Sequence, residues 1–185
     1  MKAHALSSRI CLVSAILAAC AGCDVNHSGV TRVVEAATPT PIVLNEQAVD
    51  DVALSLSVRG TEYRMTRAEL EAIRPHRVQT STFWSADRGT FEGPLLRDVL
   101  ARVGLDSAEA VRLTGLDGFS NVIPRQDWER WPILIASRNN GKPIPVSAKG
   151  PLRIIYPRDM DAELLEPIYR LRWVWLLARI DEAPR

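Results

Sequence analysis

Residues 139–157 combine a turn, a glycine-proline junction and an apolar strand within one short stretch of the chain. Asn139-Asn140-Gly141 is typical of a hairpin turn, because asparagine and glycine tolerate the positive φ angles that such turns require. Gly150-Pro151 marks a second corner, and Leu152–Tyr156 is apolar enough to be a buried strand that ends before a proline. This stretch therefore favours closely connected β-strands.

Further strands are expected along the rest of the chain. Val52–Val58 alternates apolar with small or polar side chains, which is the period of a half-buried strand. The connections are mostly too short for parallel crossovers, so the pattern predicts an α+β fold with a mixed or mainly antiparallel sheet. In the last expected strand, Trp173, Trp175 and Leu177 would share one side. The expected strands are Val52–Val58, Arg77–Phe83, Ala110–Leu113, Ser120–Ile123, Ile133–Ala136, Leu152–Tyr156 and Leu171–Ile180.

Short helices are expected between these strands. Thr66 and Glu69 form a capping box, which predicts a helix over Arg67–Ile73. Apolar residues from Leu96 to Val103 fall on one helical face and predict a second helix there. One or two helical turns are expected over Arg125–Trp131.

The amino end has the features of a targeting segment. Lys2 and Arg9 accompany an apolar run over Ile10–Ala19 that is too short to span a bilayer. Leu17-Ala18-Ala19-Cys20 resembles the bacterial lipobox, in which the cysteine becomes the lipidated first residue. We therefore expect a lipoprotein signal peptide over residues 1–19 and a membrane anchor on Cys20, at the periplasmic face of the bacterial envelope. The alternative is an ordinary signal peptide that is cleaved elsewhere.

The remaining chain is expected to contain a tether and one domain. Residues 20–48 show no clear period and are expected to be a flexible tether, and residues 49–185 have the length of one domain. Cys11, Cys20 and Cys23 all precede this domain, which therefore has no disulfide and no thiol. The formal net charge of +1 provides no excess of positive charge for binding nucleic acid.

Four segments, in this order, resemble the small stand-alone molybdopterin-binding domain of the sulfite oxidase family. Phe91–Leu100 is similar to the family's F-x-G-x-P-L-x-x-[LV]-L, with one residue fewer between glycine and proline. Asp117–Ser120 is similar to D-G-[YF]-[ST], and residues 139–157 are similar to N-G-x-P-[LIV]-P followed by H-G-x-P-[LV]-R. Arg172–Leu176 resembles the closing strand with its [KR]-W pair. The resemblance covers residues 52–181 and implies the family's α+β fold.

The resemblance also implies a molybdenum ion that is bound by a pterin dithiolene and by one cysteine of the protein. The matching stretch here, Arg77–Trp84, has hydroxyl groups and no sulfur, and Lys149 stands where the family has a histidine. A neutral hydroxyl is a poorer ligand than a thiolate for such a metal. We therefore favour a non-catalytic binding or sensory module for a small anion or an envelope membrane protein. The alternatives are a molybdopterin-dependent oxidoreductase acting on a small oxyanion or sulfoxide, and a purely structural lipoprotein without a concave site.

The candidate cleft is drawn from the segments that match the family. Gly150 could bring backbone amides close to a ligand, or it could form a corner ahead of the strand. Lys149 and Arg153 could neutralise an oxyanion, but we expect them to be a solvated pair of charges. Phe119 could line a pocket or belong to the core. No catalytic residue and no metal ligand are assigned, and molybdopterin is the candidate cofactor. The cleft candidates are Thr80, Ser81, Thr82, Trp84, Gly118, Phe119, Ser120, Lys149, Gly150 and Arg153.

Overall fold

The computed structural model describes residues 38–44, 52–85 and 87–184. The expected signal peptide over residues 1–19 and the expected lipidation of Cys20 lie outside the described residues, so both stay predictions. Strand β1 (Thr40–Pro41) pairs with β4 (His76–Thr80). The range expected as a tether, residues 20–48, thus includes two residues that form an edge strand, where a proline is tolerated because its nitrogen need not donate.

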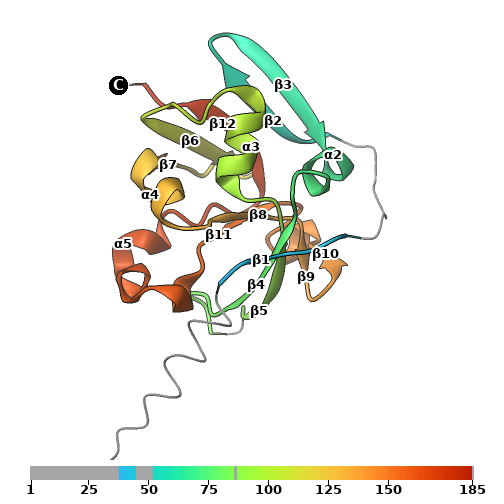
Figure 1. Ribbon diagram of the computed structural model, residues 1–185, viewed down its shortest axis with the longest axis vertical. Helices are drawn as coiled ribbons and strands as arrows, with labels where there is room; N and C mark the ends of the chain where they lie inside the picture. The colour runs from blue at the N-terminus through green and yellow to red at the C-terminus, as the bar shows by residue number, and fades with distance from the viewer. Residues whose placement is uncertain (1–37, 45–51, 86, 185) are drawn as a thin grey trace, which may run out of the picture.

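The sheet in the lower part of Figure 1, called the lower sheet, has the strand order β1-β4-β5-β9-β10 and is antiparallel throughout. Its last two strands form the predicted hairpin. Asn140 and Gly141 at the turn have φ angles of 51° and 76°, as a tight hairpin turn between twisted strands requires. The bounds are β5 Gly89–Gly93, β9 Arg138–Asn139 and β10 Lys142–Pro143.

The upper sheet has the order β3-β2-β12-β6-β7, and β12 runs parallel to β2 and antiparallel to β6. Strands β8 and β11 form a small antiparallel sheet that lies between the two larger sheets in Figure 1. The mixed, mainly antiparallel sheets with short helices confirm the predicted α+β fold. The bounds are β2 Val52–Val58, β3 Thr61–Thr66, β6 Ala110–Gly115, β7 Ser120–Pro124, β8 Leu134–Ala136, β11 Arg153–Ile155 and β12 Leu177–Glu182.

The predicted helices form, and two of them end earlier than expected. The Thr66 hydroxyl accepts from the Glu69 amide at 3.2 Å, and the Glu69 carboxylate accepts from the Thr66 amide at 2.8 Å, which confirms the capping box. The helix after it ends earlier than expected, at Glu71. The helix over Leu96–Val103 buries its apolar face, and Gly104 ends it with a φ of 79°. The bounds are α2 Arg67–Glu71, α3 Leu96–Val103, α4 Arg125–Arg130 and α5 Pro167–Arg170, with single 3₁₀ turns at Val146–Ala148, Arg158–Met160 and Ala162–Leu165.

The prediction of a strand over Leu171–Ile180 is wrong in its first half. The strand β12 begins at Leu177, and the chain before it follows helix α5 without regular structure. Trp173 and Val174 are both buried, whereas a half-buried strand would expose every second side chain. The alternation of large apolar residues in the sequence therefore reflects a buried connection that is packed on both sides.

Strands β3 and β5 were not predicted, for different reasons. Most of β3 is exposed, so it carries no apolar period, and it pairs with β2 through a turn at Arg59 and Gly60, whose φ angles are 48° and 85°. Strand β5 is buried where it passes β8. A Cβ atom at Gly93 would collide with the backbone carbonyl of Ile135, so only glycine permits this close crossing.

Candidate functional site

The candidate site is built around the connection between β4 and β5, of which residues 81–85 and 87–88 are described. The Asp159 carboxylate accepts from the Ser81 amide at 2.6 Å and from the Ser81 hydroxyl at 2.5 Å. Arg158 donates to the same hydroxyl at 2.8 Å. The Thr82 hydroxyl donates to the Trp84 carbonyl at 3.0 Å and accepts from the Trp84 amide at 3.1 Å. The hydroxyl groups of Ser81 and Thr82 are therefore bonded within the protein.

A polar hollow of about 450 Å³ lies beside this connection, and we call it the hydroxyl cleft. Three of the predicted residues, Thr80, Ser81 and Thr82, line it together with Trp84. Arg88 also lines it and is exposed, and it forms no ion pair with the described residues. The complete lining is Gln79, Thr80, Ser81, Thr82, Trp84, Ser85, Arg88, Gly89, Thr90, Asn140 and Asp159.

Asp87 connects the two predicted cationic residues. Its carboxylate accepts from the Arg153 guanidinium at 3.0 and 2.7 Å and from the Lys149 ammonium at 2.7 Å. Burial raises the pKa of Asp87, but the hydrogen bonds and positive charges of Arg153 and Lys149 outweigh burial and hold this pKa below its ordinary value. The expectation of a solvated pair of charges is wrong for Arg153, which is 1% exposed. Strand β11 is buried on both faces, so this side chain pairs with a carboxylate instead of reaching water.

Trp84 lies among cations and other indoles. The Lys149 ammonium sits 5.1 Å from the centre of the Trp84 ring and 4.4 Å from that of Trp175. The Arg170 guanidinium lies 5.4 Å from the centre of the Trp84 ring. Such contacts are attractive because the face of an indole carries negative charge density.

A second hollow of about 260 Å³, here called the tryptophan pocket, also has Trp84 in its wall. Phe119 lines it and is 44% exposed, which places this side chain at a pocket and not in the core. The complete lining is Trp84, Asp117, Phe119, Arg170, Leu171, Trp173 and Trp175.

The predicted cleft residues thus meet around Trp84 but divide between two hollows. Gly118 lies in the turn between β6 and β7, Ser120 is the first residue of β7, and neither lines either hollow. Gly150 is buried, and a Cβ atom there would collide with the carbonyl of Ile144. The backbone of Gly150 thus lies against the protein's own backbone. This favours the interpretation of Gly150 as a corner ahead of strand β11 over its interpretation as a ligand contact. These hollows also count against a purely structural protein without a concave site.

Sequence reasoning missed Asp87, Asp159 and Arg170. Asp87 is separated from Arg153 by a long stretch of sequence, and no local pattern identifies it as the partner of a buried arginine. Arg170 is the last residue of α5, a helix that the sequence pattern did not predict. Its position beside Trp84 depends on how α5 packs against the rest of the protein. These residues acquire their roles through tertiary contacts.

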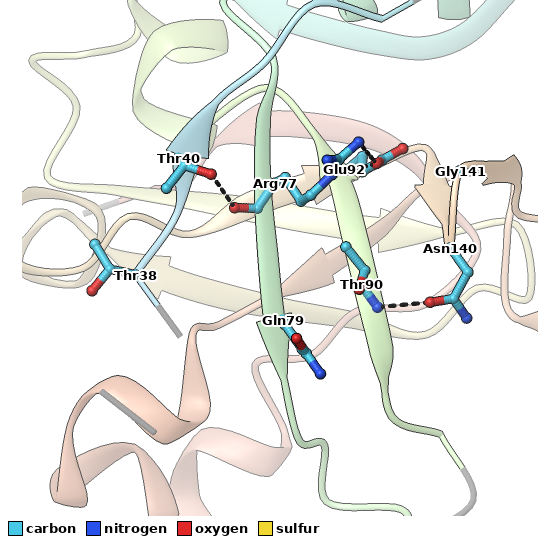
Figure 2. A pocket seen from close by; sticks show the side chains of 8 residues that line it. All are labelled: Thr38, Thr40, Arg77, Gln79, Thr90, Glu92, Asn140 and Gly141. Atoms are coloured by element: carbon cyan, nitrogen blue, oxygen red, sulfur yellow. Dashed lines mark hydrogen bonds and ion pairs between the residues drawn. The ribbon is translucent and has the colours of Figure 1, made fainter. Parts of the chain in front are cut away.

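A third hollow of about 580 Å³ extends over β4 and β5, and Figure 2 shows its polar lining. Thr40 donates to the Arg77 carbonyl at 3.5 Å, and Asn140 accepts from the Thr90 amide at 3.1 Å. The Arg77 guanidinium pairs with Glu92 at 2.7 Å. The polar groups of this third hollow thus bond largely to one another. Asn140 and Thr90 line both this hollow and the hydroxyl cleft, so the two are adjacent. The complete lining is Thr38, Thr40, Arg77, Gln79, Thr90, Glu92, Asn140 and Gly141.

Comparison with known families supports the resemblance that the sequence suggested. The sequence model of the oxidoreductase molybdopterin binding domain matches residues 64–170, which include both the β4–β5 connection and α5. The chain belongs to this family. A search of curated proteins finds no match. The family makes molybdopterin the candidate cofactor of the domain.

The donor atoms of the site decide whether a molybdenum centre fits. The described residues include no cysteine, and they contain no group of three or more His, Cys, Asp or Glu side chains placed to hold a metal ion. The Ser81 and Thr82 hydroxyls lie in the segment where the sequence resemblance would place the family's cysteine, and they are bonded within the protein. These donors do not fit a metal that is held through protein sulfur.

Among the described helices, none has the length and apolarity needed to cross a membrane.

Proposed function

We propose that this chain is a non-catalytic binding module of the molybdopterin-binding domain family that takes a small anion in the hydroxyl cleft. The observation that carries the proposal is an excess of positive charge around the β4–β5 connection. Among the described residues, Asp87 and Asp159 supply the carboxylates that bond there. The cations in and around it are Arg88, Lys149, Arg153, Arg158 and Arg170.

Arg88 is the cation with the best access to an incoming anion. It is exposed and lines the cleft, while Lys149 and Arg153 already donate hydrogen bonds to the Asp87 carboxylate. A guanidinium can hold two oxygen atoms of an oxyanion through parallel hydrogen bonds. We therefore expect Arg88 to provide the principal attraction, with neighbouring amide and hydroxyl groups orienting the anion.

The alternative function is a molybdopterin-dependent oxidoreductase acting on a small oxyanion or sulfoxide, which the family membership favours. When bound, that cofactor would supply two-electron redox chemistry. The hydroxyls present in place of a thiolate support the binding module instead. The two functions differ in metal content, which can be measured without knowing a substrate.

We further propose that the protein is exported and held at the periplasmic face of the bacterial envelope by lipid on Cys20, where it meets a membrane-bound partner. An anchored domain raises the effective concentration of such a partner. Metabolic labelling with a radioactive fatty acid tests the anchor. We expect label on the unaltered chain and none on Cys20→Ala, and equal labelling of both would contradict the proposal.

Two measurements on the purified full chain test the proposed function. Elemental analysis should find no stoichiometric molybdenum, and oxidation should release no fluorescent pterin. Titration calorimetry with sulfate and phosphate should show binding that Arg88→Gln weakens roughly tenfold, because a hydrogen bond to a charged group contributes about 1.5–3 kcal/mol. Arg97→Gln, at an exposed position on α3, is the matched control and should leave binding unchanged. Stoichiometric molybdenum with pterin would overturn the binding module in favour of the oxidoreductase.

A further inference from the structure

Strand β3 leaves one side of its backbone unpaired within the part of the chain that the structure describes. It stands first in the order of the upper sheet, and β2 is the strand that pairs with it. Figure 1 shows β3 at the outer edge of this sheet. Its first four residues, Thr61–Arg64, are exposed. An exposed strand edge presents N–H and C=O groups to solvent and is a template for pairing with another strand.

The turn before β3 decides which of its backbone groups face outward. This turn has two residues, and Val58 pairs with Thr61 directly beside it. In a hairpin of this kind the pair that flanks the turn exchanges both of its hydrogen bonds, and bonded and non-bonded pairs alternate from there. Thr61 and Tyr63 therefore bond to β2, whereas the backbone groups of Glu62 and Arg64 point to the open edge.

The side chains along this edge are accessible and carry charges of opposite sign. Glu62 and Arg64 lie on one face of the strand, with 3.6 Å between their charged groups, and their side chains are 45% and 66% exposed. Arg179 of β12 also lies 4.0 Å from Glu62. Tyr63 lies on the other face, where it pairs with the buried Leu56, and is 40% exposed. The strand thus offers two opposite charges on one face and an aromatic ring on the other.

We propose that β3 pairs antiparallel with β3 of a second copy of this chain, about a two-fold axis at Tyr63. In this register Glu62 of each copy stands opposite Arg64 of the other. These two residues carry the outward backbone groups, so each such pair can exchange both hydrogen bonds. Opposite charges directly across two strands attract, and the two Tyr63 rings meet across the axis as an aromatic pair. A pairing of this symmetry closes at two copies.

The signs of the charges select both this register and this partner. Sliding one strand by two residues would place Glu62 opposite Glu62 or Arg64 opposite Arg64, which is repulsive. Charges on an edge strand often prevent pairing, and charges of a single sign would repel a second copy. The sequence Glu62-Tyr63-Arg64, however, is complementary to itself when two copies run antiparallel. A second copy of the chain is therefore the partner that this edge fits.

The dimer is expected to be weak. The six residues of β3 extend about 20 Å, and the area buried along such an edge is far below the roughly 1,600 Å² of a stable complex. We expect a Kd of about 0.1–1 mM in solution. The anchor proposed for Cys20 would raise the effective concentration of copies at one membrane surface. The pairing does not depend on the anion proposed for the hydroxyl cleft, which lies beside the β4–β5 connection.

Sedimentation equilibrium of the full chain, from about 10 µM to about 1 mM, tests the pairing by charge reversal. The unaltered chain should show a dimer whose share rises with concentration. Glu62→Arg gives this edge two positive side chains, and Arg64→Glu gives it two negative ones. Each variant alone should dimerise at least about tenfold more weakly, because like charges then face each other in both cross-strand pairs.

Restoring the opposite charges should restore the dimer. An equimolar mixture of Glu62→Arg and Arg64→Glu should form heterodimers with about the affinity of the unaltered chain, and the double variant should again pair with itself. Arg97→Glu makes the same change of net charge as Arg64→Glu at an exposed position on α3, and it should leave the dimer unchanged. Because Glu62 and Arg64 are exposed, the urea midpoint of each variant should stay close to that of the unaltered chain.

Three outcomes would overturn the inference. The first is an unaltered chain that stays monomeric up to about 1 mM, above the expected Kd. The second is a dimer that both single reversals leave unchanged, since the copies would then meet through another surface. The third is a mixture of the two single reversals that stays monomeric although the unaltered chain dimerises, because the cross-strand charges would then not set the pairing.

Discussion

Replacing Asp87 by asparagine removes one negative charge while it preserves the size of the side chain. The change leaves Arg153 as a buried guanidinium without its carboxylate, because the structure gives this side chain two hydrogen bonds to Asp87 at 3.0 and 2.7 Å. Arg153 is 1% exposed and cannot turn to water without opening the core. We therefore expect Asp87→Asn to destabilise the folded protein strongly.

The magnitude comes almost entirely from Arg153. Removing one partner of a buried ion pair typically costs about 3–5 kcal/mol, since the remaining charge is left uncompensated. Lys149 adds little, because its side chain is 27% exposed and can reach solvent, where an ion pair is worth about 0–1 kcal/mol. The expected loss in the free energy of unfolding is thus about 3–5 kcal/mol, a large part of the stability of an ordinary domain.

Equilibrium unfolding in urea, followed by tryptophan fluorescence, measures this loss. With a slope of about 2 kcal/mol per molar urea, the midpoint should fall by about 1.5–2.5 M. The double variant Asp87→Asn, Arg153→Met removes both charges and should recover much of the stability, because an apolar side chain in the same place needs no partner.

Asp181→Asn is the matched control, because Asp181 pairs with Arg179 at the surface. The two side chains are 26% and 45% exposed, so the loss should stay below about 1 kcal/mol. A loss below about 1 kcal/mol in Asp87→Asn as well would refute the reasoning that burial of Arg153 makes the pair indispensable. Failure of the double variant to recover stability would refute the assignment of the cost to the unpaired guanidinium.

Three further predictions follow from the same structure. The pKa of Asp87 is lowered on folding, so ionised Asp87 stabilises the folded protein. This stabilisation is complete above the ordinary pKa of about 3.9 and is lost as the pH falls through the folded-state pKa. From pH 6 to pH 2.5, the free energy of unfolding should therefore fall more steeply for the unaltered chain than for Asp87→Asn. Gly93→Ala should cost about 1–3 kcal/mol or prevent folding, because its Cβ meets the Ile135 carbonyl, and an unchanged urea midpoint would contradict this. Tyr156→Phe should cost about 1.5–3 kcal/mol in the same assay, because it leaves the buried Asp127 with one donor fewer, and a neutral result would show that this hydroxyl is dispensable.

Elements with local signals were predicted well. The capping box before α2, the alternation in β2 and the turn at Asn140 and Gly141 each depend on residues that are close in sequence, so the pattern and the structure agree. Strand β3 was missed because its side chains are mostly exposed, and β5 because burial against β8 leaves no alternation. The connection that holds Trp173 was taken for a strand because large apolar residues at every second position also occur in buried irregular structure.

The candidate site was predicted less completely than the fold. Thr80–Thr82, Trp84 and Phe119 were found through the family resemblance, and the structure places them at two hollows that share Trp84. The network that joins Lys149 and Arg153 was not foreseen, because Asp87 lies far from both in the sequence. Which carboxylate meets a buried cation depends on how β11 packs against the β4–β5 connection, and no local pattern encodes that.

Composition and order along the chain suffice to show that no cysteine follows Cys23 and that the domain belongs to the molybdopterin-binding family. Both conclusions depend on residue identity and spacing, which do not require coordinates. Only the tertiary structure decided that Arg153 is buried against Asp87 and that the candidate residues surround Trp84 in two separate hollows. The physical reason is that burial and charge pairing are properties of segments brought together by folding, over distances along the chain at which sequence patterns carry no information.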